Sequence, residues 1–398
     1  MNNLSPQEQA TVELVQQYQR RRFSRRDFLG KALALGMTLP AAASLLAACG
    51  DNTATSAPAN SGAATSATTA AAAPSGPPTK MIVMGNGAVL GDTLKSELIA
   101  PFEKKYNTKI EYVVSQTTEQ LTRLRAEKDS PTVDFIFTGE AVAVTMRGEG
   151  LLEKMDAAKV PNMSKVVDAF KNDAGYAPIS GAYANMPLWN KAKVSQPLTG
   201  WADLWRPELK EGVSFPDITN TTGLLFLILA AQINGGGIDN MDPGFAAMVK
   251  LKPNFHPSTG WAGIGSDQVN LTKQGDISAL VTFIGLARPA KEEQGSPVEF
   301  SASLKEGYPP SPLTLGIVKG TKNLDLVHNL INEVLTDNVQ LALASKASVS
   351  PCTTVKLPAD LEKIVPAAST MQKLDWQKIA AARPGWTERW GKEVIAKK

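Results

Sequence analysis

Cysteine and histidine are scarce in this sequence. Its 398 residues include two cysteines, Cys49 and Cys352, and two histidines, His256 and His328. The Cys and His spacings typical of zinc sites are missing, as are the HExxH and GxSxG patterns of metalloproteases and hydrolases. We therefore predict no metal site and no cofactor. Cys352 is expected to be an inert thiol, because no activating base is linked to it.

A charge excess of one sign is also missing from most of the chain. The formal net charge is +3, from 41 basic and 38 acidic residues. Six of the basic and three of the acidic residues precede Cys49, so the remainder carries 35 of each sign. A nucleic-acid-binding surface needs clustered Lys and Arg. The balanced charge argues against a nucleic-acid partner.

The apolar stretch near the N-terminus is short for a transmembrane helix. It contains Gly36 and Pro40, whereas a spanning helix needs about 20 mainly apolar residues. Arg25 and Arg26 precede it within the segment SRRDFLGK. A charged region, an apolar region and small residues in this order are typical of an export leader, here of the twin-arginine type. We predict that residues 1–48 are a signal peptide, with a membrane anchor as the alternative.

A lipid attachment site and a tether are predicted to follow. The segment LAAC that ends at Cys49 resembles the bacterial lipobox, whose cysteine becomes a lipid-modified N-terminus. The resemblance implies that Cys49 is lipidated and holds the protein at a membrane. Residues 50–79 contain only Ala, Ser, Thr, Gly, Pro and Asn apart from Asp51. Because such a segment cannot bury enough apolar surface to become ordered, residues 49–79 are predicted to be a disordered tether.

Strand and helix patterns alternate from residue 80 onwards. Short apolar runs at 81–84, 109–114 and 133–137 are typical of strands, and helical spacing lies between them. This alternation predicts an α/β fold with a mainly parallel sheet. Ligands of such sheets bind beyond the carboxyl ends of the strands. There are therefore two candidate ligand loops. The loop after the strand at 81–84 contains Asn86, and the loop after the strand at 133–137 contains Thr138 and Glu140.

Four segments carry a family resemblance. They are PFEKKY at 101–106, DFIF at 134–137, WADLWRPEL at 201–209 and WTERW at 386–390. They resemble bacterial extracellular solute-binding proteins of ABC importers, nearest the branch that binds polyamines, ferric iron or thiamine. The resemblance covers most of residues 80–398. It implies a type II periplasmic-binding fold, in which two α/β lobes with mainly parallel sheets are joined by a hinge that closes on the ligand.

The resemblance also implies where the chain crosses between the lobes. The crossings are expected near residues 176–188 and 308–317, where prolines suit extended chain. The expected lobes are lobe 1, residues 80–180 with 313–345, and lobe 2, residues 181–312 with 346–398.

Further candidate ligand-binding residues lie in the second lobe. Thr221 and Thr222 follow Asn220, a good N-cap before an apolar helix, so they either face the cleft or only cap that helix. Trp261 stands among glycines and is a candidate cleft wall. Asp267 lies at the start of another predicted helix.

The sequence leaves the ligand open. In polyamine receptors an aromatic and an acidic residue follow the strand that is predicted here before Phe283. Phe283 supplies the aromatic ring, but residues 285–287 (GLA) offer no carboxylate. Arg288 could instead clamp a carboxylate, phosphate or phosphonate, or form a surface or interlobe ion pair. Asp267, Glu140 and Asp217 could still serve a cationic ligand. The adjacent tyrosines typical of iron receptors are missing.

The resemblance implies a function without chemistry. The protein is expected to be an extracytoplasmic, lipid-anchored, monomeric receptor on the outer face of the cell membrane. It would capture a small polyamine-like or other solute and deliver it to an ABC permease and its ATPase. Two alternatives from other classes stay open: a secreted lipoprotein enzyme, and an adhesion or scaffold protein on the same fold.

Overall fold

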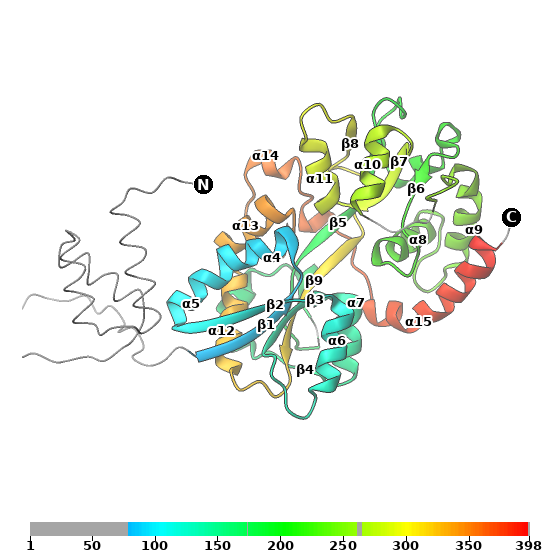
Figure 1. The fold of residues 1–398 in the computed structure, drawn as a ribbon. Helices are drawn as coiled ribbons and strands as arrows, with labels where there is room; N and C mark the ends of the chain where they lie inside the picture. The colour runs from blue at the N-terminus through cyan, green and yellow to red at the C-terminus, as the bar shows by residue number, and fades with distance from the viewer. Residues whose placement is uncertain (1–78, 173, 261–264, 397–398) are drawn as a thin grey trace, which may run out of the picture. The chain divides into compact units, whose positions relative to one another are not determined.

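The computed structural model describes residues 79–172, 174–260 and 265–396 (Figure 1). The predicted leader, the lipidation site Cys49, the tether up to residue 78 and Trp261 lie outside these residues. The first strand begins at Thr79, the last residue predicted for the tether.

Strands and helices alternate along most of the described chain. The strands are β1 (Thr79–Gly85), β2 (Thr108–Val114), β3 (Phe135–Gly139), β4 (Leu152–Glu153), β5 (Ile179–Asn190), β6 (Val213–Ser214), β7 (Ala279–Phe283), β8 (Val298–Phe300), β9 (Pro310–Val318) and β10 (Ser350–Pro351). The helices are α4 (Ala88–Leu94), α5 (Ala100–Tyr106), α6 (Thr117–Ala126), α7 (Glu140–Gly148), α8 (Thr221–Ile233), α9 (Asp242–Leu251), α10 (Ser266–Gln274), α11 (Ile284–Glu292), α12 (Leu324–Val334), α13 (Asp337–Ala347), α14 (Ala359–Glu362) and α15 (Trp376–Arg389). The α/β fold predicted from the alternation is confirmed.

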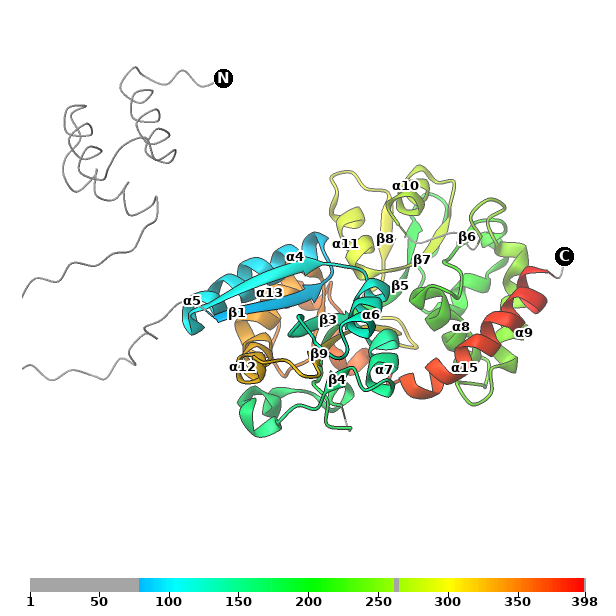
Figure 2. The ribbon, with the colours of Figure 1, turned by 60° about the horizontal axis from the view of Figure 1, so that its bottom comes forward.

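The N-terminal strands form a parallel layer, in which β3 is buried on both faces and β2 is the partly exposed edge. β1 pairs in parallel with β2 and with β3. In β3, Phe135 and Phe137 join one buried cluster, whereas Ile136 joins the other, because successive strand residues point to opposite faces. The helices α4 and α5 with α13 cover one face, and α6 with α7 covers the other (Figure 2). We call this part of the molecule the β1–β3 half; it comprises β1–β4, α4–α7, α12 and α13.

A long strand continues from this layer into a second one. The residues of β5 up to Ala184 pair with β9, and those from Asn185 onwards pair with β7. β7 in turn pairs in parallel with β6, so the strand order is β2-β1-β3-β9-β5-β7-β6. We call β6–β8 with α8–α11 the β6–β7 half. The two long antiparallel strands, β5 and β9, lie where the crossings were expected.

The apolar helix α8 forms the centre of the β6–β7 half. Its residues 224–231 are all buried, at 1% exposure or less. A helix that is hydrophobic on every side has to be enclosed on every side. Phe226 contacts the rings of Trp201, Trp205 and Phe215, so these two tryptophans, four residues apart, serve the packing of this half.

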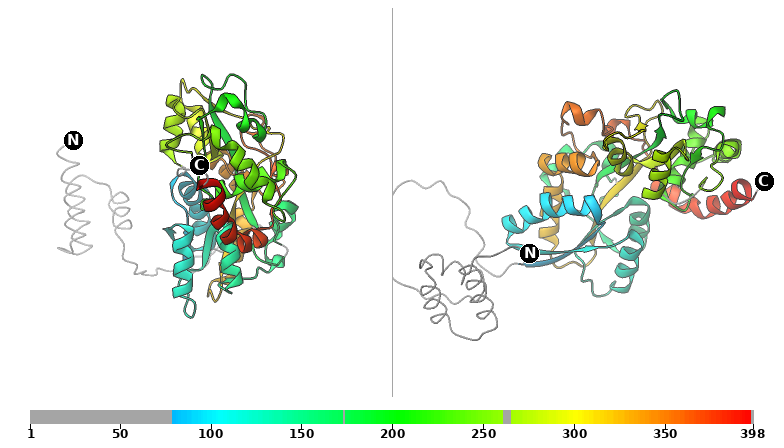
Figure 3. Two further views of the ribbon diagram at one scale, coloured as in Figure 1. Left: turned by 90° about the vertical axis from the view of Figure 1, so that its right-hand side faces the viewer. Right: turned by 45° about the horizontal axis from the view of Figure 1, so that its top comes forward.

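The C-terminal region contacts both halves. β10 pairs with β5 at Gly181 and Ala182, and the amide of Thr354 donates to the carbonyl of Lys165. Lys165 lies in the expected lobe 1, whereas Gly181 and Ala182 lie at the expected start of lobe 2, so residues 350–354 contact segments on both sides of that predicted boundary. Figure 3 shows α15 running from α7 towards α9. Across the part of the chain that the structure describes, none of the helices has the length and hydrophobicity needed to span a bilayer.

Candidate ligand-binding site

A cavity of about 540 Å³ lies between the two halves, beyond the carboxyl ends of β1, β3 and β7. This is the position at which α/β sheets bind their ligands. Both halves contribute to its wall. The lining residues are 86–90, Thr117, 139–142, Tyr183, 220–222, Phe283, Gly285, Leu286, Pro289, 311–313, 346–348 and Trp376.

Five of the candidate residues meet at this cavity. Asn86 and Glu140 come from the two loops predicted in the β1–β3 half. Thr221, Thr222 and Phe283 come from the β6–β7 half. These five side chains are spread over almost 200 positions of the sequence, and the fold brings them together around one space.

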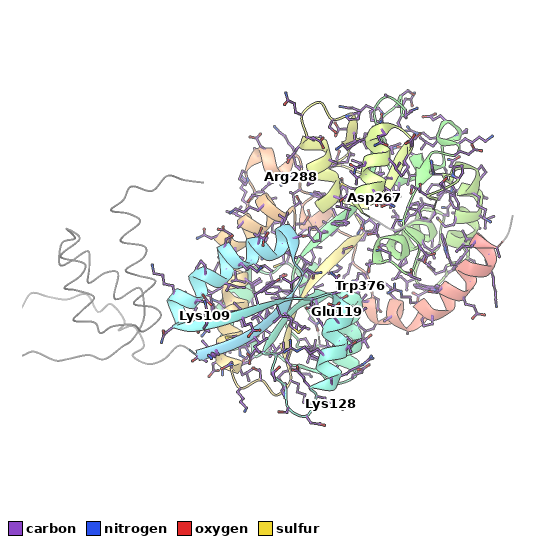
Figure 4. The ribbon with its side chains drawn as sticks, in the orientation of Figure 1. Lys109, Glu119, Lys128, Asp267, Arg288 and Trp376 are labelled. Atoms are coloured by element: carbon purple, nitrogen blue, oxygen red, sulfur yellow. The ribbon has the colours of Figure 1, made fainter. Side chains whose placement is uncertain are left out.

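The other described candidates lie away from the cavity lining. Thr138 is 1% exposed and its hydroxyl has no hydrogen-bond partner. Asp267 is exposed on the first turn of α10, and Arg288 lies on α11 (Figure 4). Arg288 donates to the carbonyl of Ser345 at 2.8 Å and pairs with Glu292. Of the two roles considered for Arg288, these contacts favour the ion pair over the binding of an acidic ligand.

The one carboxylate among the described lining residues is already paired. Glu140 is the first residue of α7, and the guanidinium of Arg147, two turns later, reaches back to both its oxygens. The hydroxyl of Thr314 donates to the same carboxylate at 2.5 Å. The side chains of Glu140 and Arg147 are only 7% and 10% exposed. Because a buried charge needs a partner, this pair neutralises the acidic side of the cavity.

Several helices begin at the cavity. The lining includes Thr117 at the start of α6, Gly139 before α7, Asn220 before α8 and Phe283 before α11. The side chain of Asn220 accepts from the amide of Thr222 at 2.8 Å, as predicted for an N-cap. The starts of α7 and α11 have no side-chain cap. Uncapped amide groups at helix N-termini attract anionic or acceptor groups of a ligand.

Aromatic rings supply the apolar part of the wall. The ring centroids of Tyr183 and Phe283 lie 5.3 Å apart, edge to face. Trp376, the first residue of α15, also lines the cavity and lies near the middle of the molecule in Figure 4. Sequence reasoning missed Tyr183 and Trp376 as lining residues. Tyr183 carried a signal, because it lies in the predicted crossing at 176–188.

One buried and one partly buried tyrosine lead us to predict that the protein loses stability at alkaline pH. Burial raises the pKa of Tyr183 and of Tyr308 from 10 to about 12. The unfolded chain then loses these protons first, so the contribution of the two tyrosines to the free energy of unfolding should be constant below pH 10 and be lost between about pH 10 and 12. Each shift corresponds to about 3 kcal/mol. Urea unfolding at a series of pH values from 9 to 12 measures the loss of stability, and tyrosinate absorbance follows the phenols. Tyr308→Phe should remove part of the loss. Tyrosines of the native protein that all titrate near pH 10 would contradict the prediction.

A second cavity, of about 950 Å³, adjoins the first. The two share Glu140, Pro312 and Trp376, so these side chains form the partition between them. The second cavity is lined by Arg147 and Tyr176, and the guanidinium of Arg147 lies 5.7 Å from the Tyr176 ring. The paired carboxylate is therefore enclosed between two spaces.

Cys352 is 0% exposed and its pKa is raised by burial. His328 is buried too; its Nε2 accepts from the amide of Asp156 at 2.9 Å, and its Nδ1 lies 2.8 Å from the carbonyl of Leu324. Both side chains are part of the buried interior. In the described residues no three His, Cys, Asp or Glu side chains come close enough to hold a metal ion.

Known proteins with this sequence pattern and fold are solute receptors. Residues 97–368 match the family described as bacterial extracellular solute-binding protein. The spermidine/putrescine-binding periplasmic protein of Escherichia coli (strain K12) is 26% identical over 324 residues, which are 75% of this chain and 88% of that protein. An ABC transporter structure from Clostridium perfringens ATCC 13124 is 26% identical, with a TM-score of 0.70, covering 79% of this chain and 99% of the other.

A more distant structure shares the fold alone. The periplasmic binding protein AfuA from Actinobacillus pleuropneumoniae, solved with fructose-6-phosphate, is 19% identical, with a TM-score of 0.60, covering 80% of this chain and 99% of the other. The named relatives thus bind ligands of opposite charge. The periplasmic-binding fold expected from the resemblance is confirmed, and relatives of this kind support an extracytoplasmic location. The chain belongs to the bacterial extracellular solute-binding protein family, whose members are the solute receptors of ABC transporters.

Proposed function

We propose that this protein captures a small solute in the cavity between its two halves and delivers it to an ABC permease and its ATPase, without altering it. The observation that carries the proposal is the cavity itself, because residues of both halves line it at the carboxyl ends of the strands. We further propose that the mature protein is a monomer held at the outer face of the membrane by lipid on Cys49. A mature protein with its first fifty residues intact would contradict the anchoring.

We also propose that the halves move as lobes about β5 and β9. β5 pairs with β9 in one layer and with β7 in the other, and β9 runs antiparallel beside the first part of β5. We propose that residues 350–354 belong to lobe 1, supported by the amide of Cys352, which donates to Gln340, and by that of Thr354, which donates to the carbonyl of Lys165. Closure of such lobes would enclose a solute.

The residues that line the cavity indicate the chemical class of the solute. Relatives named for spermidine and putrescine favour a polyamine. The lining described here favours a different solute, because Glu140 is paired with Arg147 and the other charged lining residue is Lys346. A cation has no free carboxylate to meet in this lining. We propose a small solute with an apolar part for Phe283 and Tyr183, and an acidic or hydrogen-bond-accepting group for the helix N-termini.

The test is a solute panel measured by thermal melting of the full chain. The panel contains putrescine, spermidine, dicarboxylates and aliphatic amino acids, and native mass spectrometry of the purified protein identifies any bound solute. We expect an acidic or zwitterionic solute to raise the melting temperature. Phe283→Leu should weaken that shift, whereas Phe300→Leu, outside the cavity lining, should not. A shift produced only by the polyamines would overturn the ligand class and leave the receptor function standing.

A further inference from the structure

Arg288 connects two helices from opposite halves. It lies on α11, in the β6–β7 half, and its Nη1 donates to the carbonyl of Ser345 at 2.8 Å and to that of Ala344 at 3.4 Å. Both acceptors belong to the last turn of α13, in the β1–β3 half. Glu292, one turn after Arg288, accepts from Nε at 2.7 Å and holds the guanidinium in this orientation.

The two ends of this connection are chemically matched. The carbonyls of a last helical turn have no donors within their own helix, and they carry the negative end of the helix dipole. A guanidinium offers several donors in one plane and stays charged. The Arg288 side chain is only 17% exposed, although its contact with the Ser345 carbonyl lies at the surface.

The same two helices also form part of the cavity wall. Leu286 and Pro289 of α11 line it, as do Lys346, Ala347 and Ser348 at the end of α13. Arg288 therefore joins, outside the cavity lining, two segments from opposite halves that both form part of the cavity wall. If the halves rotate apart about β5 and β9, this contact breaks.

We propose that Arg288 is an interlobe latch, a positioning residue that favours the closed cavity without contacting the solute. This inference goes beyond the receptor function, since it concerns the balance between open and closed forms. A contact made in one of two conformations shifts the population towards that conformation. Losing it should change the ratio of closed to open molecules about tenfold.

The test needs no solute, so its outcome is independent of the ligand class. Spin labels are placed on exposed positions of each half by Lys104→Cys and Asn270→Cys, in full-length protein carrying Cys49→Ser. The buried Cys352 stays unlabelled. Pulsed electron paramagnetic resonance then gives the distribution of distances between the halves. We expect Arg288→Gln to move this distribution towards the open form.

Arg206 provides the matched control. Its side chain is 22% exposed, pairs with Asp203 and donates to the carbonyl of Gln196 at 2.9 Å, but all its partners lie close by in sequence. Arg206→Gln should leave the distance distribution unchanged. Glu292→Gln leaves the Arg288 guanidinium in place but removes the carboxylate that orients it, so it should shift the distance distribution less than Arg288→Gln does. This variant also tests the proposal if Arg288→Gln does not fold. Distributions for the Arg288 and Glu292 variants that match the unsubstituted protein would overturn the latch.

Discussion

Replacing Arg147 with methionine is expected to lower the free energy of unfolding by about 3–5 kcal/mol, because it leaves the buried carboxylate of Glu140 without its cation. The pair is nearly enclosed, and Thr314 is the other side chain that donates to Glu140. Methionine keeps much of the side-chain length, so the loss reports the charge rather than packing. Urea unfolding with a circular-dichroism readout measures the change.

An exposed arginine gives the control for this prediction. Arg125 makes an ion pair with Glu149 in which both side chains are more than a third exposed. Exposed pairs contribute little, so Arg125→Met should change the unfolding free energy only slightly. The double variant Glu140→Gln with Arg147→Met should recover much of the loss, since no charge is left buried. A loss for Arg147→Met no larger than that for Arg125→Met would show that the pair does not stabilise the fold.

The same substitution also tests the ligand class. Without Arg147, the carboxylate of Glu140 is free to face a cation in the cavity. Putrescine should then raise the melting temperature of Arg147→Met more than that of the unsubstituted protein. An equal shift in both proteins would mean that the Glu140–Arg147 pair does not exclude cations.

Replacing Gly223 with alanine is the second large effect we expect. A Cβ atom at this position would lie 2.1 Å from the carbonyl oxygen of Pro216 and 2.4 Å from that of Asp217. Backbone atoms cannot rotate away, so the start of α8 has to shift, at a cost of roughly 2–5 kcal/mol. Residues 220–222 at that helix start line the cavity, so solute binding should be lost as well. Thermal melting and the solute panel measure the two effects.

Gly385→Ala is the matched substitution. Gly385 also lies within a helix, α15, but a Cβ atom there meets no other atom within 4 Å. Alanine is favoured over glycine in a helix by about 0.5–1 kcal/mol, so this variant should be as stable as the starting protein or slightly more stable. Similar melting temperatures for the two variants would disprove the close approach at Gly223.

Local signals in the sequence predicted much of the fold and part of the site. The strand predicted at 133–137 overlaps β3, which runs two residues further along the chain, and the N-cap predicted at Asn220 is confirmed; both signals depend on neighbouring residues. The loops containing Asn86 and Glu140 were located from the rule that ligands bind at strand ends. The sequence could not decide whether Arg288 binds a ligand or another part of the protein, because its acceptors in α13 lie more than fifty residues away along the chain.

The sequence by itself determined the alternation of strands and helices, the balanced charge beyond Cys49 and the family, because periodicity, composition and motifs are properties of short segments. The tertiary structure alone decided which side chains share the cavity and which charges remain free there. Glu140 is a candidate cation ligand in the sequence, and it becomes a neutralised wall residue only when Arg147 and Thr314 are brought to it. Burial and long-range pairing set the electrostatics of a site, and neither can be obtained from residue order alone.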